Sequence, residues 1–210
     1  EDVDSVLELV AGKVVEVLEA QAMTVFLVEG GEVAFRHVYY SPTLWEEDPS
    51  LEDGFAERRE QLLERRIPRG SGIVGEVIES GDPVFFDARR DADRMHSMQE
   101  ETGFAIRSML TVPLKGSERN LGAIQVLNKE PGALVPEFSE EDRGLLEEIA
   151  EYSASLIQRM LDSKFQLSDA EAARFIAQLT DTELVSDPDA VAVDENLVQA
   201  VGDAMVRRDG

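Results

Sequence analysis

The chain has 210 residues, a formal net charge of −24 and no cysteine. So acidic a surface repels phosphate backbones and anionic lipids, which argues against nucleic-acid binding and membrane insertion, and without cysteine no disulfide, thiolate metal site or nucleophilic thiol can form. The hydrophobic fraction of 43% supports a core, but no apolar run could span a bilayer and no signal peptide is present. These properties fit a cytoplasmic protein of one large or two small domains, and a chain that starts on Glu1 is expected to be a piece of a longer protein.

The first part of the chain predicts a helix followed by a β-hairpin. Apolar residues recur at helical spacing over 3–20. Two alternating apolar stretches, 22–28 and 32–40, flank a Glu-Gly-Gly turn, which is typical of two antiparallel strands. The acidic stretch 41–53 then predicts a loop, and 54–66 a short charged helix.

The middle of the chain predicts a helix over 72–80, a short strand over 83–87 and a partly helical segment over 88–101. Gly81 follows the first of these helices and suits its C-terminal cap.

Gly70, Gly72 and Gly75 have the spacing of a dinucleotide-binding loop. That loop requires a buried strand directly before its first glycine, whereas the charged stretch 64–69 stands there. We therefore interpret the glycines as a tight turn into a helix, with amides at 72–74 that could face a ligand phosphate.

The last part of the recognisable pattern is a second hairpin and a long helix. Strands are predicted at 108–114 and 121–127, joined by a polar loop, and a helix at 138–164. Ser139 suits the helix N-cap, and Asp142 can reach back to it. The apolar stripe of this helix is wide, so it could pack entirely on its own sheet or pair partly with a second chain as a coiled coil. Residues 164–210 are predicted to be a separate helical segment of unknown role.

A motif links the second hairpin to the long helix. Asn128-Lys129 is followed by a variable loop, then by Phe138, three further residues and Asp142. This pattern resembles the cyclic-nucleotide-binding branch of the GAF domain family, found in phosphodiesterases and adenylyl cyclases, although Arg143 stands where that branch has Glu. Shorter segments that precede this motif also match the family pattern, in the same order and within residues 5–163. They are 67–75, 81–84, 87–88, 102–104 and 107–108.

The resemblance implies a domain over 1–163 with an α+β fold. A central antiparallel sheet of five to six strands would have the first and last helices on one face, while 41–66 and 88–106 would roof a ligand pocket on the other. It also implies a regulatory, small-molecule-sensing module of a cytoplasmic signalling protein, dimeric through its terminal helices, with any catalysis elsewhere in the full-length protein. Cyclic AMP or cyclic GMP is the expected ligand, and the lack of cysteine excludes a thioether-linked bilin.

Nine positions match the ligand shell of that branch. A purine ring requires a flat apolar or aromatic wall, and a cyclic phosphate requires amides, hydroxyls or a helix N-terminus. Relatives often have an acid at the position of Gln99, a threonine at Ile106 and an acid near Tyr40, so some polar contacts are altered here. The nine positions are Thr24, Tyr39, Tyr40, Ile73, Val74, Met95, Gln99, Thr102 and Ile106.

Lys129 and Asp142 are predicted to form an ion pair that ties the last strand to the final helix. The resemblance implies that this pair, with Asn128 and Phe138, shapes a lid and does not touch the ligand. The alternative is an exposed pair that contributes about 0–1 kcal/mol. Asn128 is expected to cap the backbone of the loop at 131–137 through its side-chain amide.

Three other functions stay open. A ligand-free module that only dimerises would have a collapsed pocket. A haem or other chromophore sensor is the second alternative, and haem would take His37 or His96 as its axial ligand. A bound metal ion is not expected, because such sites recruit three or four ligands. An enzyme would need a catalytic constellation that the sequence does not show.

Overall fold

The protein is built on one antiparallel sheet of six strands in the order β3-β2-β1-β6-β5-β4. The structure, a computed structural model, describes residues 3–87, 89 and 105–163. The strands are β1 (Ala20–Glu29), β2 (Glu32–Tyr40), β3 (Arg66–Pro68), β4 (Val84–Asp87), β5 (Ser108–Lys115) and β6 (Asn120–Lys129). Every pairing in the sheet is antiparallel, which confirms the predicted fold class.

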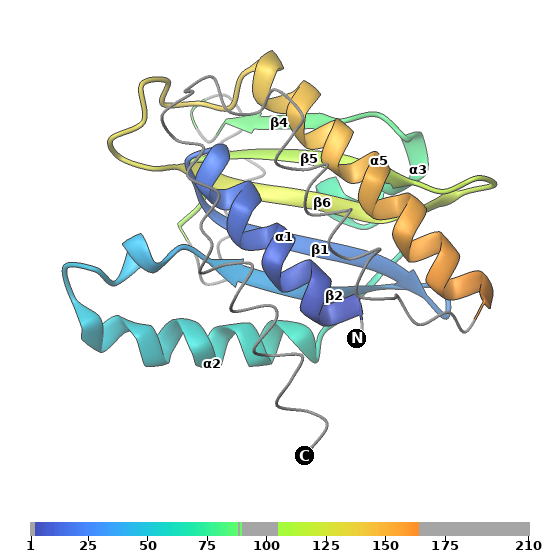
Figure 1. Ribbon diagram of the computed structural model, residues 1–210, viewed down its shortest axis with the longest axis horizontal. Helices are drawn as coiled ribbons and strands as arrows, with labels where there is room; N and C mark the ends of the chain where they lie inside the picture. The colour runs from blue at the N-terminus through green and yellow to red at the C-terminus, as the bar shows by residue number, and fades with distance from the viewer. Residues whose placement is uncertain (1–2, 88, 90–104, 164–210) are drawn as a thin grey trace, which may run out of the picture.

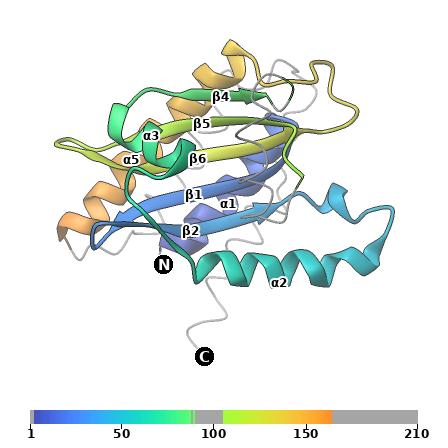
Figure 2. The same ribbon diagram turned by 180° about the vertical axis from the view of Figure 1, so that it is seen from behind.

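Helices cover both faces of the sheet. The terminal helices α1 (Val3–Val17) and α5 (Glu140–Ser163) lie side by side on one face (Figure 1), as predicted. The helix α3 (Gly72–Ser80) lies on the opposite face, and α2 (Glu52–Leu63) runs along the outer edge of β2 (Figure 2). We call these two faces the α1/α5 face and the α3 face. None of the described helices is long and apolar enough to cross a membrane.

Each face has its own hydrophobic core. In β1, Met23, Val25 and Leu27 belong to the core under α1 and α5, whereas Ala22 and Phe26 belong to the core under α3. This alternation follows from strand geometry, because successive side chains point to opposite faces. The central strands are therefore buried on both sides.

The apolar stripe of α5 packs mainly on its own sheet. Leu146, Ile149, Ala154 and Ile157 are buried in the core of the α1/α5 face. A second row is only partly buried against that core, and consists of Leu145, Tyr152 and Leu156.

Two features differ from the sequence-based expectation. The charged helix begins at Glu52 and ends at Leu63, and the stretch after it forms the edge strand β3, which pairs with the start of β2. The hairpin of β1 and β2 also contains a bulge, where Val25 faces His37 but Phe26 faces Phe35. The extra residue is Arg36, and it shifts the alternation of β2, so that Phe35 and Val38 both enter the core of the α3 face.

The glycine motif before α3 is a close packing contact, in agreement with its interpretation as a turn. Gly81 has a positive φ of 73° at the end of α3, as a C-terminal cap requires. A Cβ added to Gly75 would lie 2.4 Å from the backbone carbon of Gly70. Backbone cannot move aside like a flexible side chain, so this position requires glycine.

We predict that Gly75→Ala destabilises the protein by about 1–3 kcal/mol, because the added methyl group overpacks a buried backbone contact. Gly54→Ala in α2 is the matched control, since a Cβ there meets nothing within 4 Å. It should stabilise the protein by about 0.5–1 kcal/mol through the helix preference of alanine. Urea denaturation measures both changes, and equal effects of the two substitutions would contradict the packing described here.

Candidate functional site

A row of side chains crosses the α3 face at the middle of the sheet. Thr24 of β1 stands opposite Val38 of β2 on one side and Gln125 of β6 on the other. Gln125 in turn stands opposite Thr111 of β5. The neighbours two positions away on these strands, such as Ala22, Phe26, Ala123, Leu127 and Met109, belong to the core of the α3 face, so the row faces the same way.

The centre of this row is polar. Thr24 is 5% exposed and Thr111 is fully buried, while Gln125 is half-buried. Gln125 Nε2 donates a hydrogen bond of 3.0 Å to Thr111 Oγ1. This bond fixes the amide plane but leaves the side-chain carbonyl of Gln125 and one amide hydrogen for another partner. An amide and two hydroxyls within an apolar face can hold a flat ligand that carries hydrogen-bonding edges.

Aromatic side chains stand at one end of the same face. The Tyr40 ring lies 5.0 Å from Phe55 of α2, and the Trp45 ring lies 5.6 Å from Phe55. The Arg58 guanidinium lies 6.0 Å from the Phe55 ring. Burial raises the pKa of the Tyr40 hydroxyl to about 12, against a smaller lowering by Arg58.

Five of the nine predicted ligand-shell positions come together on the α3 face. Thr24 and Tyr40 come from the first hairpin, and Ile73 and Val74 from the first turn of α3. Ile106 is buried in the same core shortly before β5. The predicted positions Met95, Gln99 and Thr102, and the alternative axial ligand His96, lie outside the described residues.

Tyr39 does not join them. It packs against the core of the α1/α5 face, and its hydroxyl lies 3.5 Å from the place where a Cβ on Gly12 of α1 would stand. The prediction that Tyr39 lines the same pocket as Tyr40 is therefore wrong. The physical reason is the period of two in a strand, which sends neighbouring residues to opposite faces.

The sequence analysis missed Gln125 and Thr111. Thr111 is the one polar residue of the run 109–114, and Gln125 is the one polar residue of the run 121–127. That contrast is a usable signal, because a buried polar group costs free energy unless it is bonded. What the sequence could not show is that the two residues stand opposite each other.

The predicted ion pair is present, with Lys129 buried and Asp142 partly buried. Lys129 Nζ lies 3.0 Å from Asp142 Oδ1, with the two side chains 6% and 16% exposed. The alternative of an exposed pair is therefore wrong. Asp142 Oδ2 also accepts hydrogen bonds from the Ser139 amide and hydroxyl, and Ser139 Oγ accepts one from the Asp142 amide. This is the reciprocal cap predicted for the start of α5.

Asn128 caps a different segment from the one expected. It has a positive φ of 53°, and its Oδ1 accepts hydrogen bonds of 2.7 Å from the Arg107 amide and 3.2 Å from the Ser108 amide. Its Nδ2 donates 2.8 Å to the Ala105 carbonyl and 3.3 Å to Gln21 Oε1. Asn128 thus fixes the chain that enters β5, and not the loop at 131–137. The left-handed backbone turns the side chain toward that neighbouring strand.

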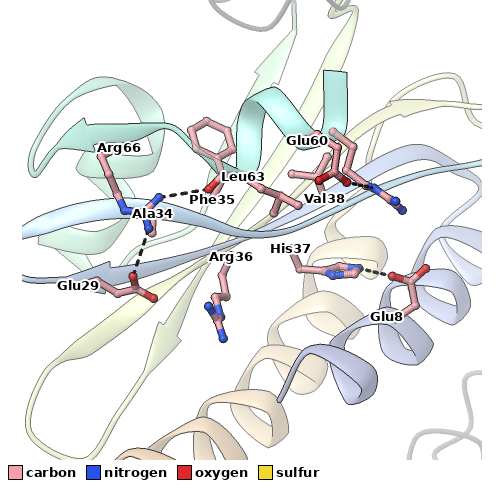
Figure 3. Close-up of a pocket in the computed structure, with 11 residues that line it drawn as sticks. Glu8, Glu29, Ala34, Phe35, Arg36, His37, Val38, Glu60, Leu63 and Arg66 are labelled. Carbon is pink, nitrogen blue, oxygen red and sulfur yellow. Dashed lines mark hydrogen bonds and ion pairs between the residues drawn. The ribbon is translucent and has the colours of Figure 1, made fainter. Parts of the chain in front are cut away.

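A surface groove of about 390 Å³ lies along β2 between α2 and α1 (Figure 3). It is separate from the polar centre of the α3 face, since Thr24, Gln125 and Thr111 do not line it. His37 in this groove is turned toward α1, with Nε2 3.5 Å from Glu8 Oε2, which does not favour it as a haem ligand on the α3 face. The groove is lined by Glu8, Glu29, Ala34, Phe35, Arg36, His37, Val38, Arg59, Glu60, Leu63 and Arg66.

Comparison with known proteins gives consistent matches. A family model described as GAF domain matches residues 1–158. The chain is 37% identical over 87 residues to the dual 3',5'-cyclic-AMP and -GMP phosphodiesterase 11 of Drosophila melanogaster, a match that covers 40% of this chain and 6% of that protein. It is 28% identical over 138 residues to the dual 3',5'-cyclic-AMP and -GMP phosphodiesterase 11A of Takifugu rubripes, covering 62% and 14%.

Solved structures agree on the fold. The GAF domain from a phosphoenolpyruvate-protein phosphotransferase of Coxiella burnetii superposes with a TM-score of 0.59 at 20% identity, covering 78% of this chain and 86% of that one. At this identity the likeness concerns the fold alone. The aligned parts of the two phosphodiesterases are small fractions of those proteins, so the similarity is to a segment of each.

The burial of Tyr40 predicts a pH dependence of stability. The folded state holds the Tyr40 proton more tightly than the unfolded chain, whose tyrosine pKa is near 10. The stabilisation that results is therefore complete below pH 10 and is lost as the pH rises toward about 12. By pH 11 the loss should reach about 1 kcal/mol. Urea unfolding at pH 9 and pH 11 measures it, and Tyr40→Phe should lose less stability over this interval. An equal loss in both proteins would contradict the assignment.

Proposed function

This chain belongs to the GAF domain family, whose members are regulatory modules that sense small molecules, and we propose that it binds a cyclic nucleotide on the α3 face. Cyclic AMP and cyclic GMP are the two candidate ligands. The observation that carries the proposal is the polar row of Thr24, Gln125 and Thr111 in the middle of an apolar sheet face. The names of the two phosphodiesterase relatives support the choice of ligand class.

The row suits the base or ribose of a nucleotide. The Gln125 amide offers both a donor and an acceptor, which matches the hydrogen-bonding edge of a purine. The cluster of Tyr40, Trp45 and Phe55 would supply the flat wall on which such a ring packs. Met95, Gln99 and Thr102 remain proposed members of the same shell.

The start of α3 suits the cyclic phosphate. Ser71 at the N-cap makes no side-chain capping bond, so its hydroxyl does not occupy the amides of the first turn. The amides at 72–74 and the positive end of the helix dipole would face an anion next to the buried side chains of Ile73 and Val74. One local site of this kind suffices for a small anion, because the field of distant surface acids is screened by salt.

The wider role we propose is regulatory. The module would belong to a cytoplasmic signalling protein, end near residue 163, and form a homodimer through α1 and α5, while 164–210 would begin a further region. The partly buried row of Leu145, Tyr152 and Leu156 on α5 supports the dimer. The same row supports the second candidate function, a structural module that dimerises without a ligand. A haem or other chromophore sensor is the third candidate, and colour in the purified protein would identify it.

Calorimetric titration of the full chain with cyclic AMP and with cyclic GMP tests the proposal. We expect heat of binding with at least one of them and a change in the emission of Trp45, the single tryptophan of the chain, because this residue packs in the aromatic cluster. No heat with either nucleotide, at protein concentrations that detect micromolar binding, would retire the proposed ligand and leave the dimerising module as the better function.

Replacement of Gln125 tests the site itself. Gln125→Leu keeps the size of the side chain but removes its hydrogen bonds, and we expect nucleotide affinity to fall by about 5- to 150-fold, the equivalent of 1–3 kcal/mol. Tyr39→Phe is the matched control, since Tyr39 lies on the opposite face and should leave affinity unchanged. A loss of affinity in Tyr39→Phe that equals the loss in Gln125→Leu would place the ligand elsewhere.

A further inference from the structure

A single ammonium group contacts both terminal helices. Lys129 Nζ, at the end of β6, donates 2.8 Å to the Leu18 carbonyl, which directly follows α1. The same nitrogen lies 3.0 Å from Asp142 Oδ1 in the first turn of α5. The centre of the Phe138 ring lies 5.3 Å from this nitrogen. The Lys129 side chain is 6% exposed. An ammonium group has three hydrogens to donate, and here its neighbours belong to two different helices.

The contact matches the electrostatics of both helix ends. The carbonyls at the end of α1 carry a partial negative charge, and a cation there is stabilising. The last turn of α1 contains no basic residue, so Lys129 supplies this cation from another element. At α5 the first turn is acidic, with Glu140, Glu141 and Asp142, and Lys129 pairs with the one of these whose carboxylate also caps the helix.

The backbone reinforces the link to α1. The Glu130 amide donates 2.7 Å to the Glu19 carbonyl, and Glu19 leaves α1 with a positive φ of 49°. The end of β6 is therefore fixed to the end of α1 by a backbone bond and by the Lys129 side chain. In contrast, the contact of Lys129 with Asp142 is made by side chains alone.

We propose that Lys129 is a positioning residue that couples α1 and α5 to β6, so that a displacement of β6 reaches both terminal helices together. β6 also carries Gln125, four positions earlier on the same strand. The regulatory meaning of this coupling rests on the proposed function, because a ligand on the α3 face would act on Gln125. The coupling itself is a property of the protein without ligand.

The geometry predicts an asymmetry between two substitutions. Lys129→Met removes the ammonium and so breaks the contacts with both helices. Asp142→Asn keeps the shape of the side chain but removes its charge and replaces one accepting oxygen by an amide donor, so a bond to Lys129 or to Ser139 is lost at α5. The contact of Lys129 with the Leu18 carbonyl remains. Arg143→Met is the matched control, because Arg143 pairs with Glu140 and Glu147 within α5, and within the described part of the chain no ion pair joins it to another element.

Amide hydrogen exchange of the full chain, measured by mass spectrometry without ligand, tests this. In Lys129→Met we expect the last turn of α1 and the first turn of α5 both to exchange about tenfold faster. In Asp142→Asn only the first turn of α5 should do so, and in Arg143→Met the end of α1 should exchange as in the wild type. Faster exchange at α5 alone in Lys129→Met would overturn the proposal. Should that variant not fold, faster exchange at both helices in Asp142→Asn would overturn it instead.

A second arm adds cyclic AMP or cyclic GMP. The expected result is a ligand-induced change of exchange in both helices of the wild type, and its loss in Lys129→Met when both proteins are saturated with the nucleotide. Retention of the change in both helices of Lys129→Met would overturn the coupling. If the wild type binds neither nucleotide, the proposed function fails, while the measurement without ligand still decides whether Lys129 joins the two helices.

Discussion

Both faces of the sheet are covered by helices, and this double burial constrains every residue of the central strands. The apolar side chains of β1 and β6 each enter one of two separate cores. A polar side chain at such a position costs free energy unless it is hydrogen bonded. The row of Thr24, Gln125 and Thr111 therefore stands out, because apolar side chains in its place would favour folding more simply. The hydrogen bond between Gln125 and Thr111 offsets part of this cost. The side-chain carbonyl of Gln125 can still accept a hydrogen bond from a ligand.

A second constraint acts where β6 leaves the sheet. A buried ion pair contributes little net stability, because removing two charges from water offsets their attraction. What the pair of Lys129 and Asp142 provides is geometry: the carboxylate caps α5, and the ammonium reaches the end of α1. Asn128, directly before Lys129, fixes the entry to β5 in the same way. Two adjacent residues thus set the relative positions of two helices and two strands.

These two constraints meet on one strand. Gln125 and Lys129 are four residues apart on β6, roughly 13 Å at the rise of an extended strand. Strand β6 is hydrogen bonded along both edges, to β1 and to β5. We therefore expect a displacement of Gln125 on the α3 face to move Lys129, and with it the terminal helices. A ligand would still shift the position of the helices only to the extent that it binds two arrangements with different affinity.

The sequence by itself determined most of the elements, with the exception of β3, and the caps of α3 and α5. Periodicity, turn residues and helix caps depend on residues that are neighbours in the chain. This is why the sequence predicted the two hairpins, the C-terminal glycine of α3, the reciprocal cap of α5 and the pairing of Lys129 with Asp142. The assignment of the terminal helices to one face came from the family resemblance. The sequence also required Tyr39 and Tyr40 to point to opposite faces, but it did not tell which of them faces α3.

Only the tertiary structure decided which residues from distant segments stand opposite one another. The bulge at Arg36, the edge strand β3, the contact of Gln125 with Thr111 and the target of Asn128 all depend on strand register. Register is set by the packing of whole faces, and a slip by one residue would exchange them. The position of the candidate site is for this reason a property of the folded sheet, while its polar side chains are already visible in the chain.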